Sequence, residues 1–575
     1  MNILVLVKQI PEISKITFDP ETGRIRREGV PLIMNSFDRR AVEEAIRIKE
    51  RIGATVTVAS MGPPQAADVL DDALRMGADN AVLITDRKFG GADTWATSSI
   101  LSSYVKKINP DLVFAGKYSL DGETSQVPPQ IAQFCNLNFI SGVSKIELED
   151  RLLRAEQEYE NGIKFIETEL PALISVSEKI NRARRVDDSV PSMKEKIKTE
   201  NSETLNCNIV GIENSLTVVE GTEVLNENRD TKFIDMKRAL EILEEALNKN
   251  HSENDIQKTE VNKNKKNGMI LGIGLGDGKT TREIASKINE IALEIACEIV
   301  IVGNVDPKEL SGMPANRYLH FKSEDIYSIA DYIGNFIVSN KPNFVIFPSN
   351  SLGRDTAGMI SAKLNLGLTA DCVDIRWESG KLVQFKPAFG GGVVARITSK
   401  TKPEMATVRP GMFKETHSDE SFPVEEILTR SSERIRILKE EKVESRLRQL
   451  QSSKIVIAIG RGIVGKAIVE RVVEISEKLG IGVGGTRPIV DMKLLPRQHQ
   501  VGITGLSISP DLYIALGVSG LDNHIMGIRY AKVVIGINKD PEAPIFHHAD
   551  YGVVGDALEF VEMLHKYSDL KSQKQ

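Results

Sequence analysis

Short apolar runs and amphipathic segments alternate along the first part of the chain. β-branched runs occur in "NILVLVK" from Asn2, in "ATVTVASMG" from Ala54, and in "NAVLIT" and "PDLVFAG". Between them lie segments such as "RRAVEEAIRIKERIG" and "TWATSSILSSYVKKI", in which apolar residues recur every three to four positions. This alternation predicts a parallel sheet with helices on both faces, and ligands bind such sheets beyond the carboxyl ends of the strands.

The same pattern returns later in the chain. "NPDLVFAGKYSLDGETS" from Asn109 and "KPNFVIFPSNSLGRDTA" from Lys341 share Pro, Val, Ser, Leu and Thr in register, and Pro171 and Pro403 keep the same spacing. We therefore expect two related α/β domains. A third unit begins near Lys454 with the strand "KIVIAIG" and the helix "AIVERVVEISEKLG". The predicted fold class is α/β, with three doubly wound parallel-sheet domains.

Two polar segments suggest where these domains are joined. The run "NKNHSENDIQKTEVNKNKKN" from Asn248 has few aliphatic residues and is typical of a linker. The charged run "RSSERIRILKEEKVESRLRQLQSS" suits a hinge, although a solvated helix would give the same pattern. The predicted divisions are a first domain with a C-terminal arm at 1–247, a linker at 248–267, a second domain at 268–429, a hinge at 430–453 and a third domain at 454–575.

Composition narrows the possible partners. The 575 residues carry a formal net charge of -6, only 5% are aromatic, and no long basic stripe is present, so we expect no nucleic-acid partner. The four cysteines lie far apart without a Cys-x-x-Cys motif, which favours reduced thiols in a cytoplasmic protein. No apolar run approaches the roughly 18 residues that span a membrane. His547 and His548 are adjacent and point apart on most backbones, so we expect no metal site.

Glycine-rich loops are the main candidates for ligand binding. "GRG" at 460–462 lies between a strand and a helix, where backbone N–H groups can approach a phosphate, although a tight turn would look the same. "GVGGTRP", "QVGITG" and "GVSGLDNH" are further loops of this kind in the third unit. In contrast, "LGIGLGDGKTTREI" from Leu271 fails the Walker A template because Ile273 stands where glycine is needed. We expect that stretch to be a strand end and a helix entry.

Several longer motifs resemble one family. "GRG", "GGTRP", "QVGITG", "DLYIALGVSGLDNH" and "INKDPEAPIFHHADYGVVGD" resemble the FAD domain of the electron-transfer flavoprotein α subunit. "SLGRDTAGMISAKLNLGLTADC", "QFKPAFGGG" and "MATVRPG" resemble its other domain. "ILVLVKQIPE", "NSFDRRAVEEAIRIKE", "RMGADNAVLI" and "GKYSLDGETSQVPPQIA" resemble the β subunit. The chain thus resembles a single-chain fusion, with the β subunit first and the polar linker as the joint.

The resemblance implies an FAD site in the third domain. The positions that match the family's FAD contacts are Arg461, Thr486, Arg487, Val501, Gly502, Ile503, Thr504, Ser519, Gly520, Leu521, Asp522, Asn523, His524, Asn538 and Asp556. By this resemblance, Arg487 and His524 would stabilise the negative charge that a flavin gains on reduction, and Thr504 could hydrogen-bond its N5 atom. The family often has glutamine where this chain has Ile503, so one polar contact is missing.

A second nucleotide, AMP or another FAD, is implied in the β-like half. The matching positions are Leu6, Asn35, Ser36, Phe37, Asp38, Met61, Thr94, Thr97, Gly116, Asp121, Gly122, Glu123, Thr124, Ser125, Gln126 and Val127. Thr94 and Thr97 lie at a helix start that suits a diphosphate, and their run is similar to that of electron-bifurcating relatives with two FAD molecules. A plain capped helix is the alternative. Ile13 stands where many non-bifurcating relatives have tyrosine.

The resemblance implies an electron carrier without bond-making catalysis of its own. Such a carrier accepts electrons from acyl-CoA-type flavin dehydrogenases of fatty acid β-oxidation and passes them to a quinone oxidoreductase. One alternative is a bifurcating flavoprotein that oxidises NADH and reduces ferredoxin. Another, from a different class, is an ATP-binding α/β protein. Because both subunits lie in one chain, we expect a monomer.

Overall fold

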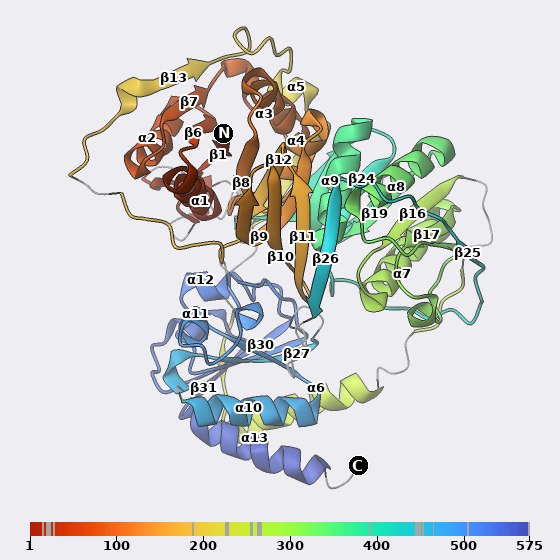
Figure 1. Cartoon of the computed structure of the whole chain (residues 1–575). Coiled ribbons are helices and arrows are strands. Elements are labelled where there is room, and N and C mark those ends of the chain that lie inside the picture. The colour runs from red at the N-terminus through yellow and green to blue at the C-terminus, as the bar shows by residue number, and fades with distance from the viewer. Residues whose placement is uncertain are drawn as a thin grey trace.

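The computed structural model contains three α/β units, as the sequence predicted (Figure 1). It describes residues 1–13, 17–18, 25–26, 29–186, 189–224, 229–252, 257–261, 267–389, 393–442, 450, 453–463, 465–502 and 505–572. We call residues 1–216 the first unit, 257–433 the second unit and 453–572 the third unit.

The first unit is built on a ten-stranded sheet. Its strand order is β13 (Ile197–Glu200), β7 (Asn80–Ile84), β6 (Thr55–Met61), β1 (Asn2–Leu6), β8 (Leu112–Gly116), β12 (Ala172–Val176), β9 (Asn138–Glu149), β10 (Leu152–Tyr159), β11 (Gly162–Glu169) and β26 (Ile435–Lys442). Neighbours from β13 to β9 are parallel, and those from β9 to β26 are antiparallel. The antiparallel extension was not predicted from the sequence.

Helices cover this sheet, and two short ladders lie near its start. The helices are α1 (Ser36–Ile52), α2 (Ala67–Met76), α3 (Thr94–Ile108), α4 (Val127–Cys135) and α5 (Gly211–Asn214). The ladders pair β2 (Gln9–Pro11) with β5 (Leu32–Met34), and β3 (Thr17–Phe18) with β4 (Ile25–Arg26). Helix α1 buries its apolar stripe and ends at Gly53, whose φ of 72° suits glycine.

The second unit repeats the parallel architecture. Its sheet has the order β20 (Leu368–Cys372), β24 (Glu404–Val408), β19 (Phe344–Pro348), β16 (Met269–Gly274), β17 (Glu298–Gly303), β18 (Arg317–His320) and β25 (Val424–Glu426). The helices are α7 (Gly278–Ile295), α8 (Ile326–Asn340) and α9 (Ser351–Leu364). The matched sequence segments form β8 and β19, and the segments after Pro171 and Pro403 form β12 and β24. The predicted repeat is therefore a structural repeat.

The loop that resembled a phosphate-binding motif is a packed strand-to-helix turn. Asp277 caps α7 by accepting a hydrogen bond of 2.8 Å from the Thr280 amide. A Cβ atom added at Gly278 would lie 2.7 Å from the Cβ of Glu309. The glycine at this position is therefore explained by close packing.

The third unit is a six-stranded parallel sheet between helices. Its order is β15 (Lys232–Phe233), β31 (Tyr551–Val554), β30 (Val533–Asn538), β29 (Leu512–Leu516), β27 (Ile455–Ile459) and β28 (Gly482–Gly485). Its helices are α10 (Lys466–Leu479), α11 (Arg487–Asp491), α12 (Asp522–Ile525) and α13 (Ala557–Ser572), and α6 (Met236–Ser252) packs beside α13. Figure 1 shows α6, α10 and α13 together on one face of this sheet.

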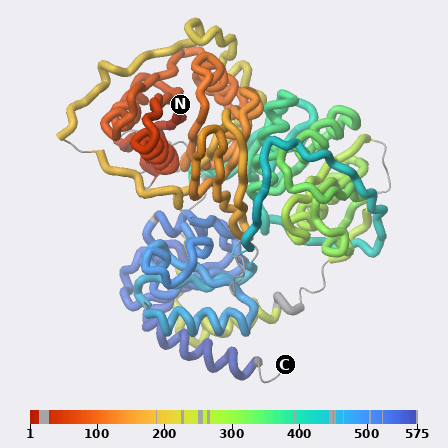
Figure 2. The backbone as a smooth tube through the Cα atoms, in the orientation of Figure 1, coloured from red at the N-terminus to blue at the C-terminus, as the bar shows by residue number. Residues whose placement is uncertain are grey.

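The units exchange segments with one another. Strand β14 (Thr217–Val224) leaves the first unit and pairs with β23 (Val393–Ser399), in a sheet that continues through β22 (Lys381–Ala388) and β21 (Asp374–Glu378). In return, β26 pairs with β11 of the first unit. Ala239, Leu243 and Leu247 of α6 are buried in the core of the third unit. Figure 2 shows α6, in yellow-green, beside the blue third unit.

The two polar segments are more structured than their composition suggested. Helix α6 extends to Ser252, into the segment predicted as a linker, and the Thr259 amide donates to the carbonyl of His417 at 2.8 Å. The rest of that segment, 253–256 and 262–266, lies outside the described residues. Within the predicted hinge, 435–442 is the strand β26, so the solvated-helix alternative is wrong there.

Candidate functional site

The candidate FAD residues outside 501–504 lie at the carboxyl ends of five adjacent parallel strands. Arg461 follows β27, Thr486 and Arg487 follow β28, Asn538 ends β30 and Asp556 follows β31. The remaining loop, with the candidates between 519 and 524, follows β29. The chain passes from β27 outward to β28 and then back across to β29, so a topological switch point lies between β27 and β29. The structure thus brings these positions to the sheet edge where ligands bind in this architecture.

Glycines let the loops at the switch point touch. A Cβ atom added at Gly460 would lie 2.2 Å from the carbonyl oxygen of Gly517, and the Gly462 amide donates to that oxygen at 2.9 Å. A Cβ atom at Gly520, whose φ is +85°, would lie 2.1 Å from the Ile545 nitrogen. Close backbone approach therefore accounts for these glycines, which is the tight-turn alternative for "GRG". A contact of Arg461 with a ligand stays a prediction.

Thr486 carries an unsatisfied hydroxyl at the end of β28. Its Oγ1 atom is buried and has no hydrogen-bond partner within the part of the chain that the structure describes, while its amide donates to the carbonyl of Ile459 at 3.0 Å. Buried hydroxyls in native proteins are almost always paired, so the orphan fits a polar atom of a ligand. The next residue, Arg487, is exposed and lies 3.3 Å from Asp491 through its Nε atom. Its guanidinium can reorient toward an anionic group.

His524 is buried and bonded at both ring nitrogens. Its Nε2 atom lies 2.7 Å from the Tyr513 hydroxyl, and its Nδ1 atom lies 3.1 Å from the Val501 carbonyl oxygen. Because that carbonyl can only accept, Nδ1 carries the proton and Nε2 accepts from Tyr513. Burial lowers the pKa of His524 to about 4, so the ring is neutral near pH 7. His524 is thus a core histidine whose ring nitrogens are both bonded within the protein, and the predicted flavin contact would need one of these bonds to open.

The other candidates shape the loops around this edge. Gly502 has a φ of +137° and its amide donates to Leu506, whereas Ile503 and Thr504 lie outside the described residues. Asn538 donates to the Val518 carbonyl at 2.9 Å. The carbonyl of Ser519 accepts from the Ile545 amide, Leu521 and Asn523 are exposed, and the side chain of Asp522 is not among those described.

Asp556 begins the last helix with an ionised carboxylate. It accepts from the Leu558 amide at 3.0 Å and pairs with Lys539 at 3.0 Å. The helix-cap amide and the lysine lower its pKa. Asn538 and Asp556 therefore anchor neighbouring loops, and their contact with an adenosine stays a prediction.

In the first unit, Asp38 cross-links the loops after β1 and β8. Its carboxylate accepts from the Lys8 amide at 2.8 Å, the Gly116 amide at 3.1 Å and the Asn35 side-chain amide at 3.0 Å. Asn35 also donates to the Tyr118 carbonyl at 2.9 Å. Burial raises the pKa of Asp38 to about 7, although these donors oppose the shift. Since β1 and β8 flank the switch point of this sheet, Asn35 and Asp38 build the walls of the second candidate site.

The loop that follows β8 is held from two sides. Asp121 pairs with Lys8 at 2.7 Å and accepts from the Gly122 amide at 2.9 Å. Lys386 of the second unit donates to the Gly122 carbonyl at 2.7 Å, a contact that the sequence did not reveal. Glu123 and Ser125 have φ values of 49° and 55°, and the Ser125 hydroxyl is buried and has no partner among the residues described. This orphan also fits a ligand.

The start of α3 is capped within the protein. Asp93 accepts from the Ala96 amide at 2.9 Å, and its other oxygen accepts from Thr217. The Thr94 hydroxyl donates to Gln126, which is buried. This geometry is that of the plain capped helix, so a diphosphate at Thr94 and Thr97 stays a prediction. Of the other candidates, Leu6 and Phe37 are buried, Met61, Thr124 and Val127 are half-buried, and Ser36 is exposed.

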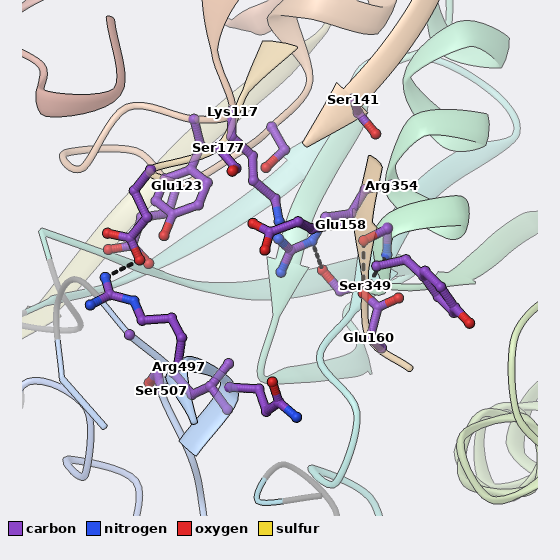
Figure 3. A pocket seen from close by; sticks show the side chains of 18 of the residues that line it. Lys117, Glu123, Ser141, Glu158, Glu160, Ser177, Ser349, Arg354, Arg497 and Ser507 are labelled. Atoms are coloured by element: carbon purple, nitrogen blue, oxygen red, sulfur yellow. Dashed lines mark hydrogen bonds and ion pairs between the residues drawn. The ribbon is translucent and has the colours of Figure 1, made fainter. Parts of the chain in front are cut away.

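A pocket of about 600 Å³ lies where the three units meet (Figure 3). Its lining includes the candidate residues Phe37, Glu123, Ser125 and Gly502, and it therefore connects both candidate sites. Arg354, Asp371 and Arg409 of the second unit also line it. Sequence reasoning missed these three as site residues, although they lie in motifs that resemble the other domain of the α subunit.

Two other kinds of feature are absent from the described residues. No cluster of three or more His, Cys, Asp or Glu side chains suited to a metal occurs among them. None of the helices in the described ranges combines the length and the hydrophobicity that crossing a bilayer demands.

Comparison with known proteins identifies the family. The model of the electron transfer flavoprotein domain matches residues 22–204 and again residues 281–433, which together exceed half of the chain. The model of the electron transfer flavoprotein FAD-binding domain matches residues 449–529. The chain belongs to the electron transfer flavoprotein family. The double match agrees with the structural repeat, and the FAD-binding match falls on the unit with the glycine-rich strand ends.

Individual flavoproteins match the two halves separately. The β subunit from Thermoanaerobacterium thermosaccharolyticum is 41% identical over 258 residues, which are 44% of this chain and 99% of that protein. The α subunit from the same organism is 39% identical over 232 residues, covering 39% of this chain and 70% of that protein. The caffeyl-CoA reductase-Etf complex subunit CarD from Acetobacterium woodii is 45% identical over 186 residues, which are 32% of this chain and 71% of that protein. The chain is thus a fusion in the order β then α.

Proposed function

We propose that this flavoprotein carries electrons on one FAD held at the carboxyl ends of β27 to β31. The observation that carries the proposal is the alignment of the candidate loops along this edge, with the Thr486 hydroxyl left unpaired beside them. The fit is chemical as well as topological, since glycines allow backbone approach and Arg487 supplies a mobile positive charge.

The residues of this chain orient and tune the cofactor. When bound, FAD supplies the redox chemistry by taking up and releasing electrons. Thr486 would hydrogen-bond the cofactor, and Arg487 would offset the negative charge that accompanies reduction. His524 is neutral and bonded at both nitrogens, so it holds the Val501 loop in place and adds no charge. Asn538 and Asp556 would support the adenosine end.

A second nucleotide in the first unit forms the next part of the proposal. The unpaired Ser125 hydroxyl and the switch point between β1 and β8 support a ligand there. An AMP would make the protein a simple carrier between acyl-CoA-type flavin dehydrogenases and a quinone oxidoreductase. A second FAD would make it a bifurcating flavoprotein that oxidises NADH and reduces ferredoxin. The likeness to a subunit of a caffeyl-CoA reductase-Etf complex favours the second version.

Cofactor content tests all of these versions at once. The purified protein is denatured, and FAD and AMP are quantified against protein after a visible spectrum and an NADH titration. One FAD with one AMP supports the simple carrier, and two FAD molecules that NADH bleaches support bifurcation. A colourless protein that retains only adenine nucleotide would instead support an ATP-binding protein and overturn the proposal. Sedimentation tests the expected monomer.

A further inference from the structure

The described parts of loop 497–507, residues 497–502 and 505–507, are contacted from both of the other units, and they include the candidate FAD positions Val501 and Gly502. From the second unit, Arg409 donates through Nη1 to the Ser507 hydroxyl at 3.1 Å. Its guanidinium also lies over the Tyr530 ring, 5.6 Å from the centroid. Arg497 of the loop donates a hydrogen bond to Glu178 of the first unit. Figure 3 shows Arg497 and Ser507 entering the pocket from the third unit.

Arg409 is itself fixed by a buried network in the second unit. One carboxylate oxygen of Asp371 accepts a hydrogen bond from Arg409. The other oxygen accepts hydrogen bonds from Arg354 at 3.0 Å and from Ser349 at 2.9 Å. The amide of Asp371 donates to the Thr407 hydroxyl at 2.8 Å. Burial opposes ionisation of Asp371, but the two arginines hold its pKa well below the usual range. The pair is therefore charged, and the guanidinium has a defined direction.

The conformation of Asp371 shows how tightly this network is specified. Its φ of 58° lies in the left-handed region, which residues other than glycine rarely adopt. Such a conformation persists where the surroundings over-determine it, and it occurs most often at functional sites. The hydrogen bonds that Asp371 makes within the second unit do not require Ser507. The hydrogen bond from Arg409 to Ser507 is therefore an additional contact, made with the third unit.

The third unit also makes an apolar contact with the first unit. Met526 of the third unit is buried in an apolar cluster with Ile10, Ile13, Phe37 and Leu120 of the first unit. This methionine lies two residues after His524. The apolar contact buries surface between the two units but does not fix their orientation, because hydrophobic contacts are not directional. The hydrogen bond from Arg409 has a defined direction.

We propose that Arg409 is a positioning residue that holds the described parts of loop 497–507, residues 497–502 and 505–507, in one orientation against the second unit. A flavin bound beside Val501 and Gly502 would take its orientation from this loop, a step that rests on the proposed function. The arginine acts through Ser507 and Tyr530 and need not touch the flavin. A lysine could not replace it, because a single ammonium cannot serve Asp371 and Ser507 with the planar fork of a guanidinium.

Four variants of the full chain separate this role from a merely structural one. S507A removes the loop-side partner and leaves the Arg409–Asp371 pair intact, and S507T restores a hydroxyl. R409K alters the arginine itself. R396K is the matched control, because Arg396 also pairs with a carboxylate, Glu378 at 2.7 Å, and lies over the Phe385 ring without reaching the third unit.

Hydrogen exchange and the visible circular dichroism of bound flavin are measured on each purified protein. We expect S507A and R409K to speed exchange in 497–507 about tenfold, the effect of losing one hydrogen bond to a charged group, and to change the flavin signal. S507T and R396K should match the unaltered protein. The proposal is overturned if S507A leaves both readouts unchanged, or if R409K loosens β20 and β24 as much as the loop. A protein without flavin would defeat the proposed function, while the exchange result would still decide the role of Arg409.

Discussion

The Tyr513 hydroxyl and the His524 Nε2 atom form a buried hydrogen bond of 2.7 Å that ties α12 to strand β29. The tyrosine is fully buried, and burial raises its pKa well above its usual value, so it stays a donor. With Nδ1 bonded to Val501, the histidine links three segments of the candidate FAD edge. Its neutral state has a measurable consequence.

We expect His524 to make the third unit less stable in acid. Its pKa in the folded protein is about 4, below the ordinary value of 6.5, so the unfolded chain binds more protons between these values. The stabilisation is therefore complete above about pH 6.5 and is lost as the pH falls toward 4, by about 3 kcal/mol in total. Hydrogen exchange of β29 amides from pH 4 to 7.5, in the natural protein and in H524Q, measures the difference.

The exposed His547 provides the control for this experiment. H547Q should follow the natural protein at every pH. A difference between the natural protein and H524Q that stays constant with pH would contradict the neutral, buried state of His524.

Replacing Thr486 by valine should separate cofactor binding from stability. The buried hydroxyl has no partner among the described residues, so T486V should leave the unfolding free energy of the FAD-free protein unchanged or slightly higher. If the hydroxyl bonds to FAD, the affinity for FAD should fall about tenfold, which corresponds to roughly 1.4 kcal/mol. Titration of the FAD-free protein by flavin fluorescence measures the affinity.

T369V is a matched control, because the Thr369 hydroxyl is also buried and unpaired but lies in the second unit. It should not change FAD affinity. Equal affinities of T486V and the natural protein would remove Thr486 from the FAD site.

Replacing Asp38 by asparagine should destabilise the first unit. All three partners of its carboxylate are N–H donors, so a side-chain amide would place a donor against a donor. We expect a loss of about 2 kcal/mol or more in the free energy of unfolding, seen as faster exchange of β1 and β8 amides, and weaker binding of the nucleotide that we propose for this unit. D111N, which weakens one exposed bond to the Asn2 amide, should cost about 0.5 kcal/mol. Similar effects of the two substitutions would contradict the cross-linking role of Asp38.

The parallel sheets could be predicted because each strand is a buried apolar run followed by a glycine or a helix start. The strand "KIVIAIG" and the helix ended by Gly480 are examples in which local pattern and final structure agree. Strand β26 was missed because its composition is charged. The alternation of Ile435 and Ile437 was the available signal, and both pack against the core of the first unit.

The candidate FAD edge could be predicted because its residues follow strand ends, whose position in a parallel sheet is fixed by topology. The contacts between the units could not be predicted from the sequence. Lys386 reaches Gly122, and Arg409 reaches Ser507, across long stretches of sequence that carry no periodic signal. The hydrogen bond between His524 and Tyr513 could not be predicted either, because the packing of the folded protein sets the direction of the tyrosine hydroxyl.

Cutting the chain at the fusion joint should leave the protein assembled. Strands β14 and β26 are exchanged between the halves, each through an antiparallel ladder of seven residue pairs, and α6 of the N-terminal half is buried in the third unit. A protease site placed between residues 262 and 266 would break only the covalent link, while these ladders and the burial of α6 hold the fragments together. We expect both fragments to co-elute on gel filtration at the volume of the uncut 63.5 kDa chain and to separate only in denaturant. Fragments that separate without denaturant would show that the linker, and not the exchanged segments, holds the two halves together.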